Sequence, residues 1–141
     1  MTVVICPSAD GEPTPEWATA LAAQRRDVIL VAPAVGVFWV AHTAMALRDL
    51  QSPIVLVAYG AATALVPTVG FAARSSRKPV SAYILVDGPL PSAEHRTTDW
   101  PDAPVTCVCD ADSDMAHQAQ LRGWQVVSGD ISDAVTAASA T

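Results

Sequence analysis

The sequence predicts an α/β fold, a three-layer αβα sandwich built around a mostly parallel, six-stranded sheet. Six short apolar runs rich in β-branched residues alternate along the chain with alanine-rich segments of helical period. The apolar runs are continuous and do not alternate with polar residues, which is typical of strands that helices bury on both faces. The 141 residues suffice for one such domain, 1–141, without an internal repeat.

The predicted strands share a β-branched, apolar composition, and each ends at or just before a Pro, Gly or Asp. They cover residues 2–6, 27–33, 53–60, 81–88, 103–110 and 124–129. The predicted helices lie between and after them, at residues 15–25, 37–50, 61–74, 114–123 and 132–140. Thr14, Asp114 and Ser132 are the expected N-caps of the first, fourth and fifth helices, because their side chains can accept a bond from a free helix amide.

One connection lacks a helix. Residues 88–104 contain four prolines and have no helical period. The segment leaves the carboxyl end of the fourth strand, on the side where open α/β sheets bind ligands. It is expected to be an ordered loop, either a small lid over that edge, in which Trp100 shields the pocket mouth, or simply a long crossover.

Composition limits the partners. The net charge of −6 argues against nucleic acid and against an anionic membrane surface. Only 16% of residues are charged, against roughly 25% in an average domain, so we expect some apolar surface to be covered by a second copy or another protein. The run Phe38-Trp39-Val40 cannot face one core with all three side chains and is a candidate for that interface. Three cysteines, with no signal peptide or membrane span, favour the cytoplasm.

The segment 58–63, AYGAAT, lies between a strand and a helix and resembles the nucleophile elbow of the α/β-hydrolase fold superfamily, whose pattern is small-x-Ser-x-small. SAYILVDGPLP resembles the next strand, and WPDAPVTCVCDADSD and LRGWQVVSGDISDAV resemble the strands that precede the triad acid and histidine. The resemblance implies a minimal, capless member of this superfamily, with strand order 2-1-3-4-5-6.

The resemblance also implies a degenerate catalytic triad. The nucleophile position falls on Gly60, the acid position on Asp112 or Asp110, and the histidine position on Asp130 or the adjacent Ile131. Triad members act as a unit, and an acid without its nucleophile and base has nothing to orient. Serine-hydrolase chemistry is therefore not expected.

The elbow can persist for another reason. Glycine relieves the backbone strain of an apex with positive φ. The amide of Ala61 and a second amide at Ser8 or Ala9 either form a half-built oxyanion site for an anion or polarised carbonyl, or belong to a turn kept for packing. Tyr59, next to the apex, and Asp112 complete this candidate binding site, and Tyr59 and His95 are the candidates for proton transfer.

No metal site or cofactor is expected. Cys107 and Cys109 point to one face of a strand that two other strands separate from the strand of Cys6 in the implied order. The DADSD segment at 110–114 begins like an EF-hand loop, but Met115 and Leu121 occupy the positions of its glycine and glutamate. No histidine has a neighbour at metal-ligand spacing.

Three functions remain open. The first is a non-hydrolytic protein that binds a small, largely apolar organic molecule and acts as an isomerase, lyase or cyclase by positioning and electrostatics. The second is a pseudo-hydrolase that serves as an interaction or homo-oligomerisation module. The third is a weak esterase with an improvised nucleophile such as Cys6.

Overall fold

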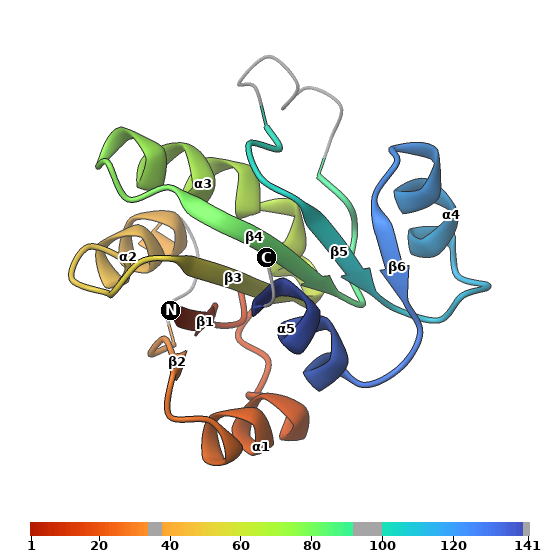
Figure 1. Cartoon of the computed structure of the whole chain (residues 1–141), viewed down its shortest axis with the longest axis horizontal. Helices are drawn as coiled ribbons and strands as arrows, with labels where there is room; N and C mark the ends of the chain where they lie inside the picture. Colours follow the sequence, from red (N-terminus) through yellow and green to blue (C-terminus); the bar gives the residue numbers. More distant parts are fainter. Residues whose placement is uncertain (34–37, 92–99, 140–141) are drawn as a thin grey trace.

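The computed structural model describes residues 1–33, 38–91 and 100–139 and confirms the predicted architecture. Six parallel strands form one sheet with the order β2-β1-β3-β4-β5-β6 (Figure 1). The strands are β1 (Thr2–Ile5), β2 (Val28–Leu30), β3 (Ile54–Tyr59), β4 (Val80–Val86), β5 (Val105–Val108) and β6 (Gln125–Val127). The predicted order 2-1-3-4-5-6 is therefore correct.

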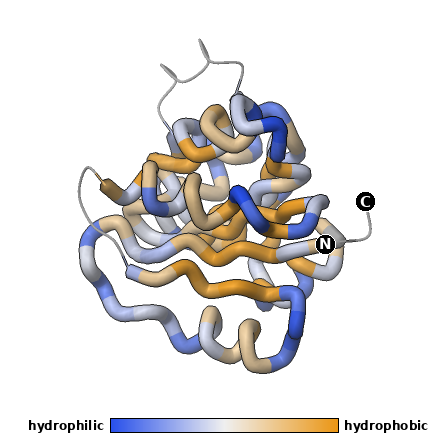
Figure 2. Tube along the Cα trace, turned by 90° about the vertical axis from the view of Figure 1, so that its left-hand side faces the viewer, coloured by the Kyte–Doolittle hydropathy of each residue, from blue (hydrophilic) through white to orange (hydrophobic). Residues whose placement is uncertain are grey.

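Five α-helices flank the sheet in the described part of the chain. They are α1 (Glu16–Gln24), α2 (Trp39–Ala46), α3 (Val66–Ser75), α4 (Asp114–Leu121) and α5 (Ile131–Ser139). The sheet separates two apolar clusters: α2, α3 and α4 cover one face, and α1 and α5 cover the other. Figure 2 shows the apolar strands as a central layer between the helices.

The strand register explains how one continuous apolar run serves both faces. Val3 pairs with Val55, and both residues lie on the α1 and α5 side. The next pair, Val4 and Leu56, lies on the α2 and α3 side. Since successive side chains of a strand point in opposite directions, each strand needs apolar residues at every position to fill both clusters.

All three predicted N-caps are wrong, Thr14 and Asp114 by one residue and Ser132 by two. Helix α1 begins at Glu16, with Pro15 at the N-cap, so Thr14 lies just before the helix. The side chain of Ser113, not Asp114, accepts the bond from the amide of Ala116 at 3.2 Å. Helix α5 begins at Ile131, and the Asp130 carboxylate accepts a bond from the Ser132 amide at 3.0 Å. In the last two cases a polar residue one or two positions earlier in the sequence caps the helix equally well.

The helix predicted for 61–74 is also wrong in detail. A 3₁₀-helix, η2 (Gly60–Ala64), follows β3, and α3 begins only at Val66. Pro67 has no amide hydrogen and lies in the first turn of α3. A helix that ran unbroken from residue 61 would place this proline in its interior, where its ring clashes with the preceding turn.

The aromatic residues Phe38, Trp39 and Trp100 differ in burial. As expected for the run at 38–40, Phe38 is 73% exposed while Trp39 is fully buried, with its indole N–H donating to the Pro7 carbonyl oxygen at 2.9 Å. Trp100 is only 8% exposed and packs edge-on against Tyr83 and Trp124. The hypothesis that Trp100 shields a pocket mouth is therefore wrong, because its ring belongs to the core.

The central part of the predicted lid, residues 92–99, and with it His95, lies outside the described residues. Within the described residues, no helix is both long enough and apolar enough to cross a bilayer.

Candidate functional site

The topology of the sheet marks one place where a ligand pocket is expected. The chain moves from β1 to β2 on one side and then returns past β1 to form β3 on the other side. The helices that follow β1 and β3 cover opposite faces of the sheet, α1 on one and α3 on the other. Such a reversal leaves a crevice outside the carboxyl ends of the two strands, and open α/β sheets bind their ligands there.

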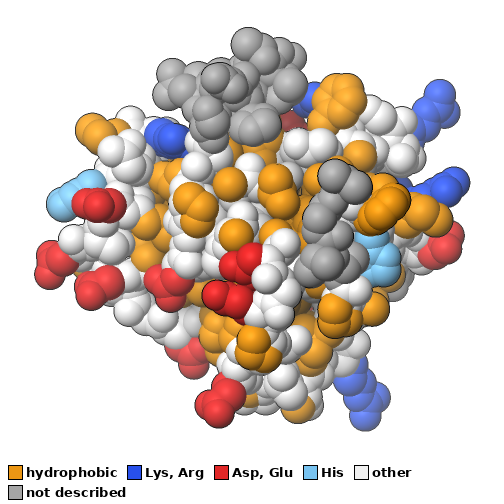
Figure 3. Space-filling view, turned by 180° about the vertical axis from the view of Figure 1, so that it is seen from behind, with side chains coloured by type: hydrophobic (Ala, Val, Ile, Leu, Met, Phe, Trp, Pro, Cys, Tyr) orange, Lys and Arg blue, Asp and Glu red, His pale blue; other side chains and the backbone are white. Residues whose placement is uncertain are grey.

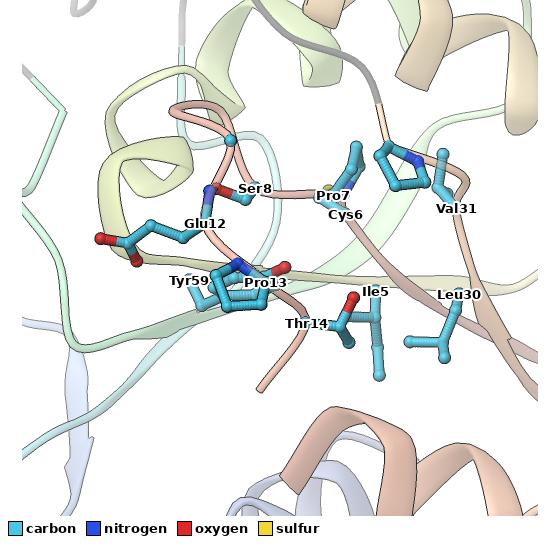
Figure 4. A pocket seen from close by; sticks show the side chains of 12 residues that line it. Ile5, Cys6, Pro7, Ser8, Glu12, Pro13, Thr14, Leu30, Val31 and Tyr59 are labelled. Carbon is cyan, nitrogen blue, oxygen red and sulfur yellow. Dashed lines mark hydrogen bonds between the residues drawn. The ribbon is translucent and has the colours of Figure 1, made fainter. Parts of the chain in front are cut away.

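A pocket of about 300 Å³ occupies this position, and we call it the switch-point pocket. It lies at the carboxyl ends of β1 and β2 and reaches Tyr59 at the end of β3 (Figure 4). Its lining consists of Ile5, Cys6, Pro7, Ser8, Gly11, Glu12, Pro13, Thr14, Leu30, Val31, Pro33 and Tyr59. The volume and the mainly apolar lining with a few hydroxyl groups are typical of small-molecule sites.

Hydroxyl groups and apolar side chains face each other in this pocket. In Figure 4 the Thr14 side chain is drawn next to Ile5, and its hydroxyl interacts with Tyr59. The Glu12 side chain extends away from the other lining residues. Thr14 and Glu12 are both exposed, so the hydroxyl group and the carboxylate lie at the rim of the pocket, beside an apolar wall that includes Ile5.

The loop after β1 is held by one hydroxyl group. Ser8 Oγ accepts bonds from the amides of Asp10 at 3.3 Å and Glu12 at 3.0 Å, and its hydroxyl donates to the Asp10 carboxylate. The bond from Ser8 lowers the pKa of Asp10, so this carboxylate is ionised at neutral pH. Because the Ser8 hydroxyl is committed to the loop, it is poorly placed to act as a nucleophile.

Tyr59 is a buried residue of the pocket that carries a hydroxyl group, with 7% of the residue exposed. Its ring packs edge-on against Trp17 at 5.6 Å between centroids. Burial is the main cause that raises the pKa of Tyr59, and hydrogen bonds from the Ser8 backbone and the Thr14 side chain oppose it only in part. Tyr59 is therefore a neutral phenol at neutral pH and can serve as a hydrogen-bond donor.

Cysteine offers no replacement for the missing nucleophile. Cys6 is buried, and its burial raises the pKa of the thiol to about 12. Burial likewise raises the pKa of Cys107 to about 12. Only the thiolate attacks a carbonyl, so both groups are unreactive thiols at neutral pH. All three cysteines are free and buried, and Cys107 and Cys109 face the same cluster, as predicted.

The elbow has the predicted backbone conformation. Gly60 has a φ of +59°, in the left-handed region. A Cβ atom built at this position would meet nothing within 4 Å, so the space for a side chain exists and the backbone alone favours glycine. The amide of the exposed Ala61 opens only the short η2, and neither Gly60 nor Ala61 lines the switch-point pocket.

The other predicted site residues are dispersed. Asp112 is exposed in the loop after β5, and Asp130 caps α5 after β6. Ala9 packs against the cluster on the α2 and α3 side. Of the six predicted binding residues, the structure brings only Ser8 and Tyr59 into the switch-point pocket.

Sequence reasoning missed Glu12, Thr14, Leu30 and Val31 as pocket residues. One signal could have found the first two. The segment PSADGEPT forms the first connection from strand to helix, which borders the reversal of strand order in the predicted topology. Within the described residues, no group of three His, Cys, Asp or Glu side chains is arranged to hold a metal ion.

Gly60→Ser is expected to lower the free energy of unfolding by about 1 kcal/mol, because serine at positive φ is strained while its side chain has room. Gly60→Asn is the control and should cost less, since asparagine tolerates this conformation. Urea unfolding measures both. The serine variant should also hydrolyse p-nitrophenyl acetate no faster than the wild type, and faster hydrolysis would show that a working base is present.

The chain matches no protein-family model, no curated protein and no solved structure. The parallel, six-stranded α/β fold therefore stands without a family assignment.

Proposed function

We propose that the protein binds a small, largely apolar organic molecule in the switch-point pocket and does not process it through a covalent serine intermediate. The position of the pocket carries this proposal. It lies at the carboxyl ends of β1 and β2, where the strand order reverses, and combines an apolar wall with the hydroxyl groups of Thr14 and Tyr59.

The chemistry that these residues support is positioning and proton donation. The Tyr59 phenol is neutral and can donate to a carbonyl or hydroxyl oxygen of the ligand, and the Thr14 hydroxyl, which donates to Tyr59, can accept. A reaction that needs orientation and a hydrogen-bond donor, such as an isomerisation, an elimination or a cyclisation, fits these groups. The three free cysteines favour a reducing compartment, and we propose the cytoplasm.

An origin among α/β-hydrolase-like proteins is part of the proposal. The strand order and the positive φ of Gly60 support it, and the residues at the triad positions argue that the hydrolytic function is lost. Without a nucleophile at Gly60 and with Asp130 engaged as a helix cap, the ancestral site has no working base.

A second candidate function is an interaction module. Phe38, Met45 and Phe71 are 73%, 65% and 52% exposed, although they are large and apolar. They belong to α2, α3 and the N-cap of α2, and these two helices contact each other. Exposed apolar residues on adjacent elements favour a partner or a second copy, and light scattering of the purified protein would reveal an oligomer.

Leu30→Trp tests the proposed pocket. Leu30 lines it and is 39% exposed, so a larger side chain can be accommodated in the fold while it fills the pocket. Ile29→Trp is the matched control, since Ile29 belongs to the same strand, is 37% exposed and is not a lining residue. Native mass spectrometry of the protein purified gently from its own host should show a retained small molecule on the wild type and on Ile29→Trp. Leu30→Trp should lose it, with affinity reduced about tenfold or more.

Two results would contradict the proposal. One is a wild-type protein with no small molecule bound. The other is an equal amount of the small molecule on all three proteins, because the ligand would then lie elsewhere.

A further inference from the structure

Charge is separated between the two edges of the sheet. Six of the seven described Lys and Arg residues lie in the last turn of a helix or in the connection from a helix to the next strand, toward the amino edge. They are Arg25, Arg26, Arg48, Arg74, Arg77 and Lys78. The seventh, Arg122, follows α4, but its guanidinium donates to the Pro91 carbonyl oxygen in the loop after β4. Nine described carboxylates lie in the connection that follows a strand or in the first turn of a helix, at the carboxyl edge. They are Asp10, Glu12, Glu16, Asp87, Asp110, Asp112, Asp114, Asp130 and Asp133.

Figure 3 shows this separation on one face, where most acidic side chains lie to the left and below and most basic side chains project from the right-hand margin. The helix dipoles do not neutralise the negative charge at the carboxyl edge. Each of the five α-helices contributes about half a positive charge at its N-terminus. This offsets only a fraction of nine negative charges, so the carboxyl edge, which includes the pocket, has a negative potential.

The charged groups around the pocket are also negative. Glu12 belongs to its rim, and Asp10 lies in the same loop with a carboxylate that Ser8 keeps ionised. None of the described Lys and Arg residues lines the pocket. A ligand that enters therefore meets negative charge and no compensating cation.

The loop is also poorly suited to bind a phosphate through its backbone. Phosphate-binding loops of α/β sheets present free amides and glycines to the anion. In this loop Pro7 and Pro13 have no amide hydrogen, and the amides of Asp10 and Glu12 already donate to Ser8 Oγ. The backbone thus offers few donors that could offset the repulsion by the carboxylates.

We propose that the switch-point pocket selects organic ligands without a negative charge, above all small amines with an apolar body, and rejects phosphates and carboxylates. The inference rests on the proposed function, because it names the ligand class of that same pocket. An amine places its apolar body against Ile5, Leu30 and Val31 and its ammonium group near the carboxylates of the rim.

Three probes that differ mainly in charge test the inference: benzylamine, benzyl alcohol and benzoate. Each is titrated into the full-length ¹⁵N-labelled protein at low salt while the amide signals of Ser8, Thr14 and Tyr59 are followed. We expect benzylamine to bind about tenfold or more tightly than benzoate, with benzyl alcohol between them, because the potential acts on the two ions in opposite directions. The preference should shrink at 0.15 M salt compared with 0.01 M, because salt shortens the Debye length to about 8 Å.

A pair of variants locates the source of the preference. Glu12→Gln removes one charge at the rim and should reduce the preference for benzylamine about threefold. Asp49→Asn removes one charge between α2 and β3, at the opposite edge, and should leave the preference unchanged. Equal changes in both variants would overturn the inference, since the local carboxylates would then not set the selectivity.

The outcomes separate this inference from the proposed function. If benzoate binds the pocket as tightly as benzylamine, the charge selectivity is wrong and the pocket remains a ligand site. If none of the three probes shifts the amide signals of the pocket, the inference is wrong, and the pocket is not accessible to these ligands. In that case, a small molecule retained by the host-purified protein would still support the proposed function on its own.

Discussion

Gly88→Ala is expected to lower the free energy of unfolding by about 3 kcal/mol, because the new methyl group would collide with backbone. A Cβ atom at Gly88 would overlap the carbonyl oxygen of Gly60 and lie 2.9 Å from its carbonyl carbon. Thr63 fixes the same corner, since its hydroxyl lies within hydrogen-bonding distance of the carbonyl oxygens of Gly60 and Pro89. The turn after β3 and the loop after β4 therefore pack without space for a methyl group.

Thermal and urea unfolding measure this loss, which should appear as a decrease in Tm of about 10 °C for a chain of this size. Gly129→Ala is the control. A Cβ there would approach only the Asp133 side chain, at 3.6 Å, which is ordinary contact. A Gly88→Ala variant as stable as the Gly129→Ala variant would show that the two segments do not pack as described.

Gly70→Ala is expected to destabilise the protein by about 2 kcal/mol, although alanine is the better helix former. The exchange of glycine for alanine inside α3 gains about 1 kcal/mol from helix propensity. Against this, a Cβ at Gly70 would overlap the Tyr83 hydroxyl oxygen and lie 3.1 Å from Tyr83 Cζ, and overpacking of this kind costs about 3 kcal/mol. The Tyr83 ring cannot move aside easily, because it is fully buried and its hydroxyl donates to Asp102 at 2.8 Å.

The double variant Gly70→Ala/Tyr83→Phe identifies the cause. Tyr83→Phe alone loses the bond to Asp102, at a cost of about 1 kcal/mol. In the double variant the colliding oxygen is absent, so the two changes should destabilise by about 1 kcal/mol less than the sum of the single effects. Strict additivity in urea unfolding would mean that the Tyr83 hydroxyl does not limit the space at Gly70.

The sequence predicted the sheet well because the signal is local. Each strand is an apolar run whose residues must fill clusters on both faces, and the runs at 54–59 and 80–86 carry this signal along their whole length. The edge strands were predicted too long: β2 covers three residues, within a predicted run of 27–33. An edge strand has a pairing partner on one side only. The apolar run of β2 therefore extends beyond its last paired residue, and composition alone does not mark where the strand ends.

The candidate site was predicted less completely, for a physical reason. Tyr59 and Ser8 adjoin strand ends, and such residues can be placed from the topology alone. Leu30 and Thr14 join them only because β2 and the start of α1 border the same crevice, a contact between segments distant in sequence. The elbow resemblance directed attention to Gly60, whose backbone has the expected conformation but which lies outside the pocket lining.

The most direct test of a ligand in the switch-point pocket is a crystal structure of the protein purified gently from its own host. We expect density for an organic molecule between Leu30, Thr14 and Tyr59, with a polar atom within hydrogen-bonding distance of a hydroxyl group. A molecule bound instead over Gly60 and Ala61, or a switch-point pocket that holds only water, would contradict this expectation.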